Sequence, residues 1–309
     1  AGQATSLVLS YVIQPYRPRW DTSKWRDLMS FSIWVGLGQA VNTINWRFDQ
    51  LALGYFLGNT TLGYYSVGDR LAVIPTREAT QPVAQAVFPG FAKLSGEPER
   101  LTRGYQRAQS VLMMVALPVG VGLAVAAEPL VLLALGEQWL PAVIVIRFLA
   151  GIFALQTVAS MVQPLAMGMG RSKILFNRSL VNLSIRVPLT LLGLLTGGFL
   201  GLLIGRSAAA LIGIGVNLYL VQTILGLSVW RQAAVNWRSL GAAAVMAVAV
   251  YVAGSQFGEG GLPLQALKAA AMIGTGAVVY PLAVLVLWLV AGRPEGPERE
   301  AIGGAQKAV

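Results

Sequence analysis

The feature that most constrains this chain is a succession of long apolar stretches separated by short polar segments. Each is close to the ~17 to 25 residues that a helix needs to cross a bilayer. A run from Leu189 to Gly226 is too long for one helix, and Thr196-Gly197-Gly198 supplies a turn that divides it. We therefore predict an all-α polytopic membrane bundle of about eight spans, at residues 28–48, 67–92, 108–134, 142–168, 175–196, 202–226, 239–255 and 264–291.

The composition supports a membrane protein and excludes several classes of function. Only 12% of the 309 residues are charged, 55% are hydrophobic, and there is no histidine or cysteine. Disulfide scaffolds, Cys/His zinc sites and nucleophiles activated by histidine are thereby excluded. We expect no catalytic residue, no metal site and no cofactor, and hence a protein that is not an enzyme.

The net charge of +10 indicates membrane topology. Sixteen of the 23 basic residues lie in five segments, and the connections 49–66, 135–141, 197–201 and 256–263 contain none. All five segments lie on the cytoplasmic side only if the polar stretch 67–92 also spans. Nucleic acid is not expected as a partner, because the basic residues are scattered between apolar runs. The basic segments are residues 1–27, 93–107, 169–178, 227–238 and 292–309.

Both ends of the chain are expected in the cytoplasm. Residues 1–15 are apolar but too short to span, and we interpret them as the last turns of a preceding helix, followed by a basic linker up to residue 27. Residues 292–309 are charged and rich in Pro and Gly, which is typical of a disordered tail.

Seven basic residues fall within or beside the predicted spans. Lys268 and Arg206 lie near predicted helix ends, where a long side chain can reach the interface. The other five would cost on the order of 12 to 17 kcal/mol if they faced lipid, so they should face a wet cavity or pair with acids. They are Arg47, Arg70, Arg77, Arg147 and Arg186.

Three predicted helices each show one polar face. In the second span, Arg70, Arg77, Gln81 and Gln85 fall on a stripe about 80° wide. The fifth span repeats Arg178, Asn182, Arg186 and Thr190 every four residues, and the first carries Gln39, Asn42, Asn45 and Asp49 on one side. Helices that turn such faces together form a cationic, hydrophilic lumen. The candidate binding residues are Arg47, Arg70, Arg77, Gln81, Gln85, Arg147, Arg178, Asn182 and Arg186.

A structural interpretation remains open for the same residues. Polar side chains also join membrane helices, and Asp49 with Arg47 or Asp69 with Arg70 would be such pairs. Prolines inside the spans similarly allow either rocking or a static kink. We favour function for the set, because the arginines exceed Asp49, Asp69 and Glu78 by about two charges, and holding a bundle together does not need a positive surplus. These three acids are candidates for charge balance or ion coupling.

Glycine recurs at every fourth position at residues 193, 197, 201 and 205. Small residues at this spacing favour close approach of helices. The turn predicted at Thr196 to Gly198 interrupts the pattern and weakens that interpretation.

Several motifs, taken in order, resemble a known family. They are PYRPRW at residues 15–20, DQLALGYFLGNTTLGYYSVGDRLAVIP at 49–75, VFPGFAKL at 87–94, LLALGEQWLPA at 132–142 and GMGR at 168–171. Over about residues 1–230 the chain is similar to the oligosaccharide flippases of bacterial polysaccharide export, within the multidrug/oligosaccharidyl-lipid/polysaccharide exporter superfamily.

The resemblance implies the C-terminal lobe of a two-lobed transporter. Residues 28–226 would form its six helices and 227–291 two additional ones, with the N-terminal lobe lacking. Asp49 would end the first span and Leu62 to Ser66 would form a junction. The implied activity is transfer of an undecaprenyl-pyrophosphate-linked oligosaccharide across the bacterial inner membrane for lipopolysaccharide, O-antigen or exopolysaccharide synthesis. Membrane lipid, a polysaccharide polymerase and glycosyltransferases are the implied partners.

Two other functions stay open. A drug/cation antiporter of the same superfamily needs an acidic cavity, and the spans have more arginines than acids. A non-transporting scaffold in a polysaccharide-assembly complex is compatible with a single lobe.

Overall fold

A computed structural model describes residues 11, 25–94, 96–258 and 260–292. These residues form α-helices, two short 3-10 helices and tight turns, with no strand among them. The predicted class, an all-α membrane bundle, is confirmed. The predicted preceding helix at 1–15 and the predicted tail at 293–309 lie outside the described residues, apart from Tyr11.

The first two helices form a nearly continuous hairpin. Helix α2 spans Trp25–Phe56 and α3 spans Gly58–Lys93, so only Leu57 separates them. Gly58 has a φ of +81°, a conformation that glycine adopts without the steric penalty of a Cβ. The prediction of a connection over 49–66 was wrong. The uncharged polar residues of this segment continue both helices, which places Asp49 inside α2 and the predicted junction Leu62 to Ser66 inside α3.

The central helices are interrupted. Residues 98–135 form α4 and α5 with a bend at Ala126. Residues 141–168 are broken by a 3-10 turn, where the buried Gln109 side chain donates a 2.9 Å hydrogen bond to the Val158 carbonyl. The elements are α4 (Pro98–Val125), α5 (Ala127–Leu135), η1 (Glu137–Trp139), α6 (Pro141–Gln156), η2 (Thr157–Ala159) and α7 (Val162–Gly168).

Helix α8 spans Ser172–Leu225 and is folded back on itself as two legs. The dihedral angles at Gly197 (φ −132°, ψ 15°) and Gly198 (φ 56°, ψ −136°) are not helical, which confirms the predicted turn. Each leg has about 25 residues and is roughly 37 Å long, enough to cross the ~30 Å core of a bilayer. The last elements are α9 (Val229–Ala234), α10 (Trp237–Ser255) and α11 (Leu262–Val290).

Glycines let the two legs of α8 touch. A Cβ on Gly193 would lie 2.1 Å from the Gly201 carbonyl oxygen, and a Cβ on Gly205 would lie 2.2 Å from the Leu189 carbonyl oxygen. The predicted turn therefore does not weaken the glycine pattern. It creates the contact by bringing the glycines of one leg against the backbone of the other.

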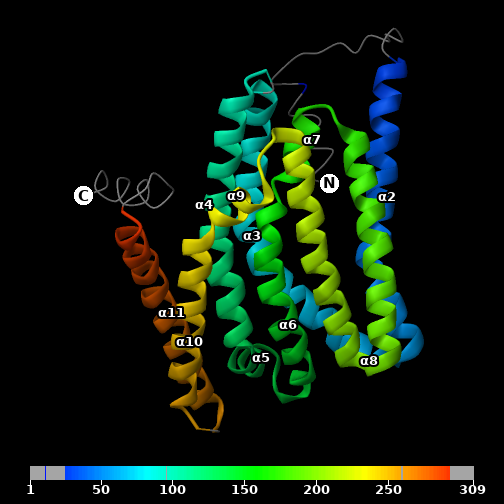
Figure 1. The fold of residues 1–309 in the computed structure, drawn as a ribbon. Coiled ribbons are helices and arrows are strands. Elements are labelled where there is room, and N and C mark those ends of the chain that lie inside the picture. The colour runs from blue at the N-terminus through cyan, green and yellow to red at the C-terminus, as the bar shows by residue number, and fades with distance from the viewer. Residues whose placement is uncertain (1–10, 12–24, 95, 259, 293–309) are drawn as a thin grey trace.

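The helices run side by side (Figure 1). Helix α2 packs against α8 at one side of the bundle, and α10 and α11 pair at the other, with α3, α4 and α6 between them. One apolar core joins α4, α7 and α10 around Tyr105, Leu112 and Met246. A second joins α2, α3, α6 and α8 around Leu53, Ile146 and Leu202.

Among the described residues, five helical segments are long and apolar enough to cross a membrane. They are α4, residues 141–168, α8, α10 and α11. Helices α2 and α3 do not pass this test, because they carry many of the polar residues discussed below.

Candidate functional site

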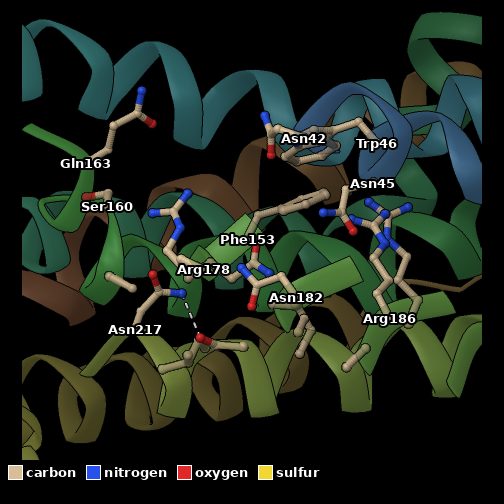
Figure 2. Close-up of a pocket in the computed structure, with 18 of the residues that line it drawn as sticks. Asn42, Asn45, Trp46, Phe153, Ser160, Gln163, Arg178, Asn182, Arg186 and Asn217 are labelled. Atoms are coloured by element: carbon tan, nitrogen blue, oxygen red, sulfur yellow. Dashed lines mark hydrogen bonds between the residues drawn. The ribbon is translucent and has the colours of Figure 1, made fainter. Parts of the chain in front are cut away.

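A polar cavity of about 480 Å³ lies among α2, α3, α6, α7 and the two legs of α8 (Figure 2). The polar faces predicted for the first and fifth spans meet here. Asn42 and Asn45 of α2 face Arg178, Asn182 and Arg186 of α8 across it. The polar face predicted for the second span is represented in the cavity by Arg77 alone.

Four arginines line the cavity, and they fall into two groups. Arg186 and Arg206 contact carboxylates. Arg77 and Arg178 have no acidic partner in the described part of the chain: the Arg77 Nε donates to Gln81 at 3.3 Å, and the buried Arg178 Nε has no hydrogen-bond partner. The cavity therefore carries a positive surplus of about two charges, the property that the sequence predicts for a lumen that holds an anion.

Asp49 is the centre of a buried ion network. Its side chain is 1% exposed, and it accepts hydrogen bonds from Arg186 and from the Tyr65 hydroxyl, the latter at 2.8 Å. The Arg206 Nε lies 3.3 Å from the same carboxylate, and the Arg206 Nη2 lies 2.8 Å from Asp69. Arg206 also contacts the Tyr65 hydroxyl. The network joins α2, α3 and both legs of α8.

The position of Arg206 corrects the sequence analysis in two ways. The second leg of α8 begins just after Gly198, so Arg206 lies about two turns inside it and is too deep to reach the interface. It is buried in the network. The suggested pairs of Asp49 with Arg47 and of Asp69 with Arg70 do not form, because Arg206 and Arg186 take both carboxylates. The distance of Arg206 from the Thr196 to Gly198 turn was the signal that could have found it.

Aromatic rings lie beside the two arginines of this network. The Arg206 guanidinium lies 5.4 Å from the ring centres of Tyr65 and Phe153. The Phe153 ring is stacked on Trp46 at 6.2 Å, and the Arg186 guanidinium lies 5.6 Å from the Trp46 ring centre. Such cation–π contacts stabilise guanidinium groups away from bulk water.

Uncharged polar side chains complete the lining. The break between α6 and α7 turns three of them into the cavity, and α8 adds one more. Sequence reasoning missed these residues, since none belongs to a polar stripe of helical period. They are Gln156, Ser160, Gln163 and Asn217.

Several predicted site residues lie elsewhere. Arg47, Arg70, Gln85 and Glu78 are exposed and do not line the cavity. Gln81 is exposed and touches the cavity only through Arg77. Arg147 forms a 2.7 Å ion pair with Glu128, and both side chains are about half exposed. The structure thus brings four of the twelve predicted residues together at the cavity wall: Arg77, Arg178, Asn182 and Arg186. Asp49 and Asp69 lie behind this wall, in contact with Arg186 and Arg206.

The described residues offer no group of three or more acidic, histidine or cysteine side chains that could hold a metal ion. The cavity chemistry is that of guanidinium, amide and hydroxyl groups, which bind anions and hydroxyl-bearing molecules.

The sequence profile of a family described as "Polysaccharide biosynthesis protein" matches residues 1–144. The match covers less than half of the chain, which is similar to this family over that part.

Two curated proteins that are similar to this chain are named for polysaccharide biosynthesis. The chain is 25% identical to the lipopolysaccharide biosynthesis protein WzxC of Escherichia coli K12, over 66% of this chain and 42% of that protein. It is 25% identical to the succinoglycan biosynthesis transport protein ExoT of Rhizobium meliloti, over 89% of this chain and 56% of that one. The chain thus spans about half the length of the curated relatives it matches.

A solved structure has the same fold. The lipid II flippase MurJ in an inward closed conformation aligns with a TM-score of 0.65 and 15% sequence identity, over 91% of this chain and 58% of that one. The likeness agrees with the predicted bundle of membrane helices.

Proposed function

We propose that this chain binds the pyrophosphate headgroup of a lipid-linked oligosaccharide in its cationic cavity and takes part in moving it across the cytoplasmic membrane. The observation that carries the proposal is a cavity of about 480 Å³ in which two arginines, Arg77 and Arg178, have no acidic partner in the described chain. The similarity to polysaccharide biosynthesis proteins supports the substrate class, a polysaccharide precursor.

The energetics of burial favour an anionic ligand. A guanidinium at membrane depth costs about 2.5 to 3.5 kcal/mol on insertion scales when nothing compensates it. A pyrophosphate offers several strong acceptors, and a guanidinium can meet two of them with parallel hydrogen bonds. Binding of the headgroup would give Arg77 and Arg178 the anionic partner that they lack within the described chain, while the polyprenyl tail stays in lipid.

The same geometry disfavours a cationic substrate. The acids beside the cavity, Asp49 and Asp69, already contact Arg186 and Arg206. A cationic drug would meet four arginine side chains and no free carboxylate, which is the wrong sign for an antiporter of cations.

Movement would use the kinked helices in an alternating-access cycle. Prolines lie inside α3, α4, α8 and α11, where each removes a backbone hydrogen bond and allows bending. The network around Asp49 joins three of the cavity helices, and its exchange of partners when the headgroup arrives is our candidate for the coupling step.

The orientation in the membrane follows the basic segments. We place residues 1–27 and the C-terminal tail in the cytoplasm, as positive-inside topology requires. A transporter of polysaccharide precursors would then receive its substrate from glycosyltransferases on that side and deliver it to a polymerase on the other.

The test measures binding of two probes of opposite charge to the purified chain in lipid nanodiscs. The probes are a short-chain polyprenyl pyrophosphate and the cation tetraphenylphosphonium. We expect the pyrophosphate to bind and Arg178→Gln to weaken it by about tenfold, the loss of one charge-assisted contact. The matched control is Arg100→Gln, whose exposed side chain pairs with Glu97 outside the cavity.

A tight complex with tetraphenylphosphonium and none with pyrophosphate would support the antiporter instead.

In cells whose only gene copy encodes Arg178→Gln, surface polysaccharide should fall while the amount of the protein in the membrane stays normal. Unchanged export would show that Arg178 has no part in transport.

A further inference from the structure

The cavity has two ends of different chemistry (Figure 2). Arg178 lies at one end with Ser160 and Gln163, and Arg186 lies at the other with Asn45 and Trp46. Arg178 and Arg186 are eight residues apart on one leg of α8, which separates their positions by roughly 12 Å. One pyrophosphate does not fill this length, so the end at Trp46 has space for another chemical group.

The position of Trp46 in the cavity wall leaves part of its indole ring accessible to a ligand. It lines the cavity and is 43% exposed, although Phe153 stacks beside it and Arg186 lies near its ring. Two other tryptophans pack against aromatic rings: Trp34 contacts Phe176 on α8, and Trp139 meets Tyr64 edge to face. An indole ring supported on one side and open on another offers the negative face of its π system to a ligand.

The amides beside Trp46 have free hydrogen-bonding capacity. The Asn45 Nδ2 donates to the Ser179 carbonyl at 3.2 Å, but its Oδ1 has no partner. The Oδ1 of Asn182 is also without a partner, and the Asn42 side chain forms no hydrogen bond within the described residues. Each free amide oxygen accepts from a hydroxyl, and each amide nitrogen donates to one.

We infer that Trp46 with Asn42, Asn45 and Asn182 forms a subsite for a sugar ring. This deepens the proposed function and rests on it. The C–H bonds on one face of a pyranose carry partial positive charge and fit the negative face of the indole, and its hydroxyls fit the amides. The sugar attached to the pyrophosphate reaches this subsite when the phosphates lie at Arg178.

The division of chemistry supports the assignment. At the Trp46 end, the positive charges of Arg186 and Arg206 are balanced by the carboxylates of Asp49 and Asp69. At the other end, Arg178 has no acid beside it in the described chain. A charged group therefore gains most at the Arg178 end. A neutral, hydroxyl-rich group fits the Trp46 end.

The experiment compares two ligands, of which only one carries a sugar. Radiolabelled short-chain polyprenyl pyrophosphate, with and without a glucose on its outer phosphate, is dialysed to equilibrium against the chain in nanodiscs. We expect Trp46→Ala to weaken the glucose-bearing probe by about tenfold and the bare probe by less than about twofold, since stacking acts on the sugar alone.

Three further variants guard against a folding defect. Trp230→Ala removes an indole that is 80% exposed and outside the cavity, and it should change neither affinity. Asn42→Ala removes an amide with no hydrogen-bond partner in the part of the chain that the structure describes, so it should leave the fold intact and still weaken the glucose-bearing probe selectively. Trp46→Phe keeps an aromatic face and should recover part of the affinity that Trp46→Ala loses.

The outcomes separate the inference from the proposed function. If Trp46→Ala and Asn42→Ala leave the sugar increment unchanged, or weaken both probes equally, the sugar subsite is refuted while binding of the bare pyrophosphate keeps the proposed function. If the unaltered chain binds neither probe, the proposed function fails and the subsite fails with it.

Discussion

Removing the Arg206 charge tests whether the buried network holds the bundle together. The Arg206 side chain is 6% exposed and contacts Asp49 at 3.3 Å and Asp69 at 2.8 Å. In Arg206→Met, Asp49 keeps Arg186 as a partner, but Asp69, which is 17% exposed, loses its ion pair. Breaking a buried pair by removing one partner costs about 3 to 5 kcal/mol, because a charge is left uncompensated.

The second substitution separates the lost contact from the stranded charge. Adding Asp69→Asn removes the carboxylate that Arg206→Met leaves unpaired, so we expect the double variant to recover about 1 to 3 kcal/mol. The free energy of unfolding is measured by titrating dodecylmaltoside micelles with SDS and following helicity by circular dichroism.

The matched control is the Arg147–Glu128 pair, which joins α6 to α5 at 2.7 Å with both side chains about half exposed. Arg147→Met should cost at most about 1 kcal/mol, the range of exposed pairs. The reasoning is refuted if Arg206→Met is no more destabilising than Arg147→Met. It is also refuted if Asp69→Asn adds its own cost instead of restoring stability.

Two further perturbations probe the backbone contacts that shape the cavity. Gly193→Ala places a Cβ 2.1 Å from the Gly201 carbonyl oxygen and should destabilise the chain by about 1 to 3 kcal/mol. Its control, Gly215→Ala, has open space around the new Cβ and should be neutral or stabilising. Equal thermal stability of the two variants would show that the legs of α8 do not touch. Gln109→Leu removes the 2.9 Å hydrogen bond to the Val158 carbonyl and should lower the free energy of unfolding by about 1 to 3 kcal/mol. This role is contradicted if amide exchange at the break between α6 and α7 stays as slow as in the unaltered chain.

Hydropathy and charge spacing were sufficient to predict the helical bundle and the turn of α8. The 3.6-residue period also placed Asn42, Asn45, Arg178, Asn182 and Arg186 on the correct faces of two helices. A period fixes the direction of a side chain about its own helix axis, and for α2 and α8 that direction points into the shared cavity.

The same period failed where the helix boundaries or neighbours were different. The stripe of α3 was predicted from four residues, but only Arg77 lines the cavity. Arg70, Gln81 and Gln85 are not among its lining residues. The prediction that Arg206 reaches the interface was wrong, because its helix begins nearer to the Gly198 turn than hydropathy indicated.

The sequence by itself determined that this chain crosses a membrane as helices, that its arginines outnumber its acids there, and where α8 folds back. These properties follow from local composition and periodicity. Only the tertiary structure decided that Asp49 pairs with Arg186 and Arg206, which lie 137 and 157 positions further along the chain. Ion pairing depends on which helices become neighbours and at what depth. Those are set by the packing of α2 on α8, a contact that no local pattern encodes.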